Sequence, residues 1–134
     1  MDKSETYIKM CEKAYPIIGN REPCARDYWM ICDGDNTDVM IITDYPTDSG
    51  CYGPGVGIPG DMYGWEPLFP IWRQDQLQEM VIEDTGSIAL IFVFNYWFYN
   101  ADIDEDSSME QLWLAFVMKE KYGKVWNGEE WINA

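Results

Sequence analysis

The sequence lacks histidine and is poor in basic residues. Of its 134 residues, 9 are Lys or Arg and 24 are Asp or Glu, so the formal net charge is −15. Without histidine the commonest general base is missing, and Ser/His or Cys/His nucleophile systems are excluded. No GxSxG, P-loop or HExxH motif occurs. We therefore expect a protein that is not an enzyme and that uses no cofactor.

Paired cysteines, an export signal and a membrane-spanning run are also missing. The cysteines stand at positions 11, 24, 32 and 51, without any CxxC pair, which favours free thiols over a zinc site. The first ten residues, MDKSETYIKM, are charged and lack the apolar core of a signal peptide. No apolar run reaches the roughly 18 residues of a membrane span. We expect a cytoplasmic protein with no membrane association and no metal.

The acidic residues are concentrated in the middle of the chain. Residues 31–109 contain fifteen Asp and Glu and one basic residue, Arg73. Such a surface repels nucleic acid and attracts basic protein surfaces, which commonly bind nucleic acid. The alternative is that the carboxylates only keep an aromatic-rich protein soluble. The net charge exceeds the roughly 2–8 charges that solubility of a small domain needs, which favours a role in binding.

Hydrophobic patterning predicts a single α+β domain over residues 1–134, with a small, mostly antiparallel sheet and two or three helices packed against it. Ser4 and Gly123 supply helix-end signals, and Ser108 with Gln111 forms a capping-box pattern. The expected elements are a helix over 4–15 ended by Pro16 and Gly19, a hairpin of strands 27–32 and 39–43, a short helix over 73–82, a central strand over 87–99, a helix over 108–122 and a turn at 126–129.

A Gly- and Pro-rich segment, residues 45–70, is predicted to be a long loop. It contains GxGxxG at 55–60, but no strand leads into it and no helix follows, so a dinucleotide site is rejected. The aromatic residues Trp65, Phe69 and Trp72 lie in or beside this loop. They are candidate anchors for a partner, and the alternative is that they cover the core.

Two acidic clusters lie in predicted turns. One surrounds Asp33, and the other has the sequence DxDxD from Asp102 to Asp106. A calcium-binding EF-hand loop also requires Gly at its sixth and Glu at its twelfth position, where this chain has Ser107 and Trp113. Acids immediately before a helix also favour its N-terminus, so a solvated acidic turn is the simpler interpretation.

Three segments, TYIKMCEKA at 6–14, RQDQLQEM at 73–80 and YGKVWNGEEWI at 122–132, resemble a family of small uncharacterised proteins encoded by phages and prophages of Gram-positive bacteria. The resemblance covers about a fifth of the chain. In that family a Leu-Pro pair tends to precede the second segment, whereas Ile71-Trp72 stands there in this chain. The resemblance implies a mobile-element origin and the host cytoplasm, but no activity.

The favoured hypothesis is a non-enzymatic phage protein that occupies the basic groove of a host nucleic-acid-handling or defence complex, as DNA-mimic and anti-CRISPR inhibitors do, without binding nucleic acid itself. The alternatives are a homo-oligomeric scaffold, such as a homodimer, that uses the 45–70 loop, and a binder of a small defence signal. The expected acidic face comprises Asp33, Asp35, Asp38, Asp44, Asp48, Asp102, Asp104, Glu105 and Asp106.

Overall fold

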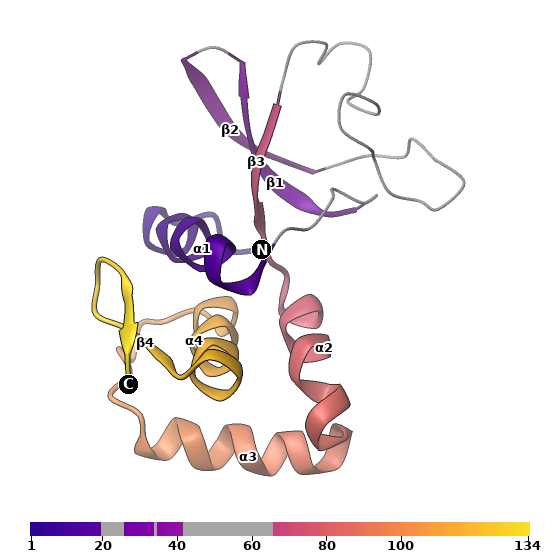
Figure 1. The fold of residues 1–134 in the computed structure, drawn as a ribbon, viewed down its shortest axis with the longest axis vertical. Helices are drawn as coiled ribbons and strands as arrows, with labels where there is room; N and C mark the ends of the chain where they lie inside the picture. The colour runs from indigo at the N-terminus through magenta and orange to yellow at the C-terminus, as the bar shows by residue number, and fades with distance from the viewer. Residues whose placement is uncertain (20–25, 34, 42–65) are drawn as a thin grey trace. The chain divides into compact units, whose positions relative to one another are not determined.

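The computed structural model describes residues 1–19, 26–33, 35–41 and 66–134. Figure 1 traces the elements in chain order. They are α1 (Glu5–Ile18), β1 (Tyr28–Asp33), β2 (Asn36–Ile41), β3 (Glu66–Ile71), α2 (Gln74–Thr85), α3 (Ser87–Asn100), α4 (Met109–Tyr122), β4 (Lys124–Trp126) and β5 (Trp131–Asn133). Four helices, a three-stranded sheet and a two-stranded sheet in this described part confirm the α+β class.

The chain divides into two compact units. Residues Met1–Ala14 and Arg73–Ala134 form one, which we call the helical unit, and residues Tyr15–Trp72 form the other, the sheet unit. Helix α1 contributes to both. The expectation of one domain over residues 1–134 stays a prediction.

The sheet unit is built on the predicted hairpin. Strands β1 and β2 pair antiparallel, with Tyr28 opposite Ile41 and Asp33 opposite Asn36. Strand β1 also pairs antiparallel with β3, so it is the central strand of the order β2-β1-β3. Trp29 and Ile31 are buried, in the alternation that a strand with one covered face requires.

Strand β3 corrects the predicted extent of the 45–70 loop. Residues Glu66–Ile71 are paired with β1, whereas residues 42–65 lie outside the described part of the chain. Pro67 and Pro70 are unfavourable in a strand because proline has no N–H to donate to the hydrogen bonds between strands. They are accommodated because β3 is an edge strand of the sheet, where prolines are tolerated.

Helix α1 begins as predicted but continues beyond Pro16. The Ser4 hydroxyl accepts a hydrogen bond from the Tyr7 N–H at 3.2 Å and so caps the first turn. Pro16 lies inside the helix, which ends at Ile18. Gly19 has φ 105° and donates its N–H to the Tyr15 carbonyl. The expectation that Pro16 ends the helix was wrong, because a proline near the end of a helix removes one hydrogen bond without preventing a last turn.

Residues 87–99 were predicted to be a central strand and form helix α3 instead. Their run is apolar apart from Asn95, and such a run does not distinguish a buried strand from a helix by its period. A run of this length is typical of a helix rather than a strand. In Figure 1, α3 runs along the edge of the helical unit beside α2 and α4.

The remaining helices follow their sequence signals. Helix α2 was expected over 73–82 and extends to Thr85. The Ser108 hydroxyl accepts from the Gln111 N–H at 3.2 Å and caps α4, which ends at Gly123 with φ 62°. This left-handed conformation costs glycine little, so the sequence signal for the helix end is confirmed.

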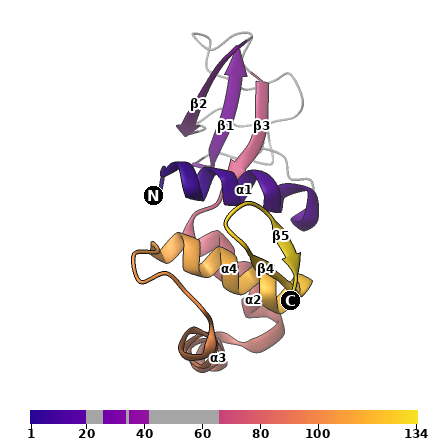
Figure 2. The ribbon, with the colours of Figure 1, turned by 90° about the vertical axis from the view of Figure 1, so that its left-hand side faces the viewer.

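The core of the helical unit is built mainly on α4. The buried side chains of α4 are Leu112, Trp113, Leu114, Phe116, Val117 and Met118. Helix α1 adds Tyr7, Met10, Cys11 and Ala14, and α2 adds Leu77 and Val81. Figure 2 shows the β4–β5 hairpin beside α4, and the Trp131 indole N–H of that hairpin donates to the Met10 carbonyl at 3.0 Å. The turn predicted at 126–129 joins its two strands, with the Asn127 side chain accepting from the Glu129 and Glu130 N–H groups.

Candidate functional site

The predicted acidic residues divide between the two units. In the helical unit, Asp102, Asp104, Glu105 and Asp106 form an exposed loop between α3 and α4, which we call the acidic loop. In the sheet unit, Asp35 and Asp38 are exposed, and Asp33 ends β1. Asp44 and Asp48 lie outside the described residues. The structure therefore brings four predicted carboxylates together in one continuous loop.

The acidic loop is held by hydrogen bonds to its own backbone. The Ser107 N–H donates to the Asp104 carbonyl at 3.0 Å, and the Asp106 N–H donates to the Asp104 Oδ1 atom at 3.1 Å. The next residue, Ser108, caps α4. These contacts tie the loop to the start of a helix, so the four carboxylates project from a defined backbone rather than from an extended tail.

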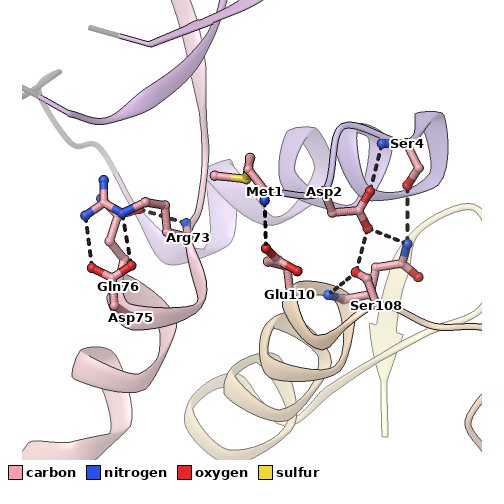
Figure 3. A network of polar contacts seen from close by, with 9 residues as sticks. Met1, Asp2, Ser4, Arg73, Asp75, Gln76, Ser108 and Glu110 are labelled. Carbon is pink, nitrogen blue, oxygen red and sulfur yellow. Dashed lines mark hydrogen bonds and ion pairs between the residues drawn. The ribbon is translucent and has the colours of Figure 1, made fainter. Parts of the chain in front are cut away.

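A polar network next to the acidic loop joins the start of α4 to the start of the chain (Figure 3). The Asp2 carboxylate accepts from the Ser108 hydroxyl at 2.6 Å, from the Gln111 amide at 2.8 Å and from the Ser4 N–H at 2.8 Å. Only the Ser108 half of the expected capping box forms, because the Gln111 side chain binds Asp2 instead of the Ser108 backbone. The network fixes the position from which the acidic loop leaves the core.

The Asp2 network also changes the acidity of its central carboxyl. Desolvation by burial raises the pKa of Asp2, but the hydrogen bonds from Ser108, Ser4 and Gln111 favour the charged form and together outweigh it. The pKa of Asp2 is therefore below its ordinary value. Nearby, the Met1 ammonium pairs with Glu110 at 3.5 Å. A shallow pocket at this place is lined by Met1, Asp2, Ser4, Asp106, Ser108, Glu110 and Gln111.

The charge of the acidic loop is not neutralised by the described part of the protein. Ion pairs of the helical unit join the Met1 ammonium to Glu110, Lys9 to Glu129 and Arg73 to Asp75, and none of these three includes a residue of the acidic loop. Among the described residues, no Lys or Arg pairs with Asp102, Asp104, Glu105 or Asp106. In the same part of the chain no three His, Cys, Asp or Glu side chains are grouped closely enough to hold a metal ion. The loop therefore presents a concentrated negative potential to solvent.

A second surface, on α3, was not expected from the sequence. Ile88, Ile91, Phe92, Tyr96 and Tyr99 are each 69–78% exposed, and Asn95 is exposed among them. We call these six residues the α3 face. Phe98, at 42%, lies at its edge. The strand assignment concealed this surface, since a strand covered on both sides has no exposed face. The sequence signal for this surface was the absence of any charged residue from a run of fourteen residues, which is long for a strand.

The other side of α3 packs against α4 through aromatic rings. Phe94 stacks on Trp113 with ring centroids 4.0 Å apart and an angle of 14° between planes. Phe94 and Trp97 also make edge contacts with Phe116, at 5.3 and 5.4 Å. Leu90 is buried as well. Helix α3 is therefore anchored along one side while its apolar opposite side faces solvent.

The three predicted aromatic anchors have different positions. Trp72 is 1% exposed, which makes it a core side chain, as the alternative interpretation supposed. Phe69 in β3 is partly exposed, and Trp65 lies outside the described residues. Among the described residues, the aromatic side chains most accessible to a partner are instead those of the α3 face.

The comparisons with known proteins identified no relative: no family model, no curated protein and no solved structure matches this chain. In the described residues, no helix combines the length and the apolar character needed to cross a bilayer. Two surfaces of the described residues, the acidic loop and the α3 face, are therefore the candidates for a functional role.

Proposed function

We propose that this chain is a non-enzymatic binding protein whose acidic loop recognises a basic protein surface. The observation that carries the proposal is the group of four exposed carboxylates in Asp102–Asp106. The loop that bears them leads directly into the capped start of α4, and none of them pairs with a Lys or Arg of the described residues. A loop that is held by hydrogen bonds to its own backbone loses less conformational entropy on binding than a disordered acidic tail, so its contacts cost less to form.

The proposed partner is the basic groove of a host nucleic-acid-handling or defence complex. Basic grooves of this kind attract closely spaced negative charges, which the acidic loop provides without nucleic acid. The net charge of −15 adds long-range steering toward such a partner. The resemblance to phage and prophage proteins supports a host-cytoplasmic setting. The expected role is inhibition, because a protein that fills the groove excludes its nucleic acid.

The test compares two variants with the same net charge. One neutralises the acidic loop by Asp102→Asn, Asp104→Asn, Glu105→Gln and Asp106→Asn. The matched control neutralises four exposed carboxylates on the helices by Glu12→Gln, Glu79→Gln, Glu83→Gln and Glu120→Gln. The Asp104→Asn substitution keeps a side-chain oxygen that can accept from the Asp106 N–H, so the loop conformation is preserved.

Tagged proteins are used to capture partners from a Gram-positive lysate at low and high salt, with and without competing duplex DNA. The proposal expects nucleic-acid-binding proteins that are released by salt and by duplex DNA. The acidic-loop variant is expected to lose them, while the control retains them. Equal loss in both variants would mean that only total charge matters, and capture that is insensitive to salt would contradict recognition by the acidic loop. A third variant, Asp35→Asn with Asp38→Asn, measures how much the exposed carboxylates of the sheet unit contribute to partner binding.

A further inference from the structure

The α3 face is at the upper limit of the apolar surfaces that soluble monomers usually expose. An aromatic side chain can bury about 150–250 Å². With its three aromatic rings and two isoleucines mostly exposed, the α3 face presents on the order of 600 Å². The largest patch on a typical monomer is about 300–600 Å², and a standard interface covers about 800 Å² on each partner. The α3 face thus supplies most of one side of a stable interface.

The chemistry of the α3 face suits a second copy of itself. From Ser87 to Asn100 the helix carries no charged residue, so two such faces meet without burying a charge. Ile88, Phe92, Asn95 and Tyr99 follow the 4-3-4 spacing of a two-helix seam. We propose that the α3 face binds the α3 face of a second copy of this chain, in an antiparallel and two-fold symmetric pair.

The antiparallel arrangement follows from register and from charge. It brings Ile88 of one copy opposite Tyr99 of the other and Phe92 opposite Asn95, so every seam residue meets another seam residue. It also places the C-terminal end of one α3, which leads into the acidic loop, beside the N-terminal end of the other. That N-terminal turn contains no acidic residue and has no side-chain cap. The positive end of its helix dipole therefore favours the neighbouring carboxylates.

Salt separates this pairing from the proposed binding of a basic partner. Two copies that each carry a net charge of −15 repel one another, and salt screens that repulsion. Self-association through α3 should therefore tighten as salt rises, whereas binding of the acidic loop to a basic surface weakens. The two proposals are independent: the purified chain alone tests the pairing, and the lysate experiment tests the partner.

The experiment measures the mass of the purified chain by sedimentation equilibrium across protein concentration, at low and high salt. Phe92→Glu and Tyr99→Glu each place a charge in the seam. Lys119→Gln, at an exposed position of α4, changes the net charge by the same amount and serves as the control. We expect the wild-type chain and the control to form a dimer, and each seam variant to raise the dimer dissociation constant by roughly tenfold or more.

A mixing experiment tests the register. Equal amounts of the Phe92→Glu and Asn95→Lys variants should form a mixed dimer, because the antiparallel register places the carboxylate introduced in one variant opposite the ammonium introduced in the other. Circular dichroism confirms that the variants remain folded, as expected from the exposed positions that they occupy.

Several outcomes would overturn the proposal. They include a chain that stays monomeric at high concentration and high salt, a dimer that survives both seam variants, and a mixture that remains monomeric. A monomer that sediments with phosphatidylcholine vesicles would identify a lipid surface as the occupant of the α3 face instead.

Discussion

The contrast between Phe92 and Phe94 provides the most decisive test of the α3 assignment. In a strand, residues two apart point to the same side, whereas in a helix two residues are separated by about 200° of rotation. The structure places Phe92 on the exposed side, at 71% exposure, and stacks Phe94 on Trp113. Replacing each by Ala therefore distinguishes the two assignments through stability alone.

The expected cost of Phe94→Ala follows from its contacts. Full burial of a Phe corresponds to about 3–5 kcal/mol on truncation to Ala, and Phe94 is half-buried. Its stacking on Trp113 and its edge contact with Phe116 add aromatic pairing worth about 0.5–1.5 kcal/mol each. We expect a loss of about 2.5 kcal/mol or more, and less than about 0.5 kcal/mol for Phe92→Ala, which loses few contacts within one copy.

The assay is urea unfolding followed by far-ultraviolet circular dichroism, which reports on the helices. With a denaturant slope of about 1–3 kcal/mol per molar urea, Phe94→Ala should lower the midpoint by about 1 M. Low protein concentration and low salt keep the chain monomeric, so Phe92→Ala does not report on the proposed pairing. Similar losses for the two variants, or a larger loss for Phe92→Ala, would refute the orientation of α3.

Two further predictions concern the helix end and the acid limit of stability. Gly123→Ala should cost about 1 kcal/mol because residue 123 has φ 62°, and Gly123→Asn should cost less; equal urea midpoints for both would contradict this account. The hydrogen bond from Arg73 lowers the pKa of Asp75, and the Asp2 network lowers the pKa of Asp2. Carboxyls with lowered folded pKa values stabilise the fold above the ordinary Asp value near pH 4, and this stabilisation is lost as the pH falls through the folded values. Urea midpoints between about pH 5 and pH 2 should therefore fall less steeply in the double variant Asp2→Asn and Asp75→Asn, and an unchanged slope would disprove the assignment.

Some elements could be predicted because their signals are local. Ser108 caps the helix that follows it, Gly123 adopts the left-handed conformation that ends that helix, and the turn at 126–129 joins two short strands. Each depends on one side chain and the backbone within a few residues. The positions of Asp102, Asp104, Glu105 and Asp106 in an exposed loop agree with the sequence. Asp33 and Asp38 were also predicted to lie in a turn, but they lie in β1 and β2, because the two strands of the hairpin pair up to Asp33 and Asn36.

Other features required contacts between distant residues. The proline-rich segment that includes β3 was predicted to be a loop. Only the strand order of the sheet shows that β3 is an edge strand, where prolines are tolerated. Gln111 was expected to complete a local capping box and instead binds Asp2, which is 109 positions away in the chain. Local reasoning fails in such cases because it does not include the residue that competes for the hydrogen bond.

The sequence alone determined the sign of the surface charge and the segments that carry it, because composition and turn chemistry do not depend on tertiary contacts. Tertiary structure decided the role of residues 87–100. Their apolar run, which Asn95 interrupts, favours burial in either conformation and contains no clear period to indicate which side is covered. Packing of Phe94 and Trp97 against α4 selects the buried side, and the same packing leaves the α3 face in solvent.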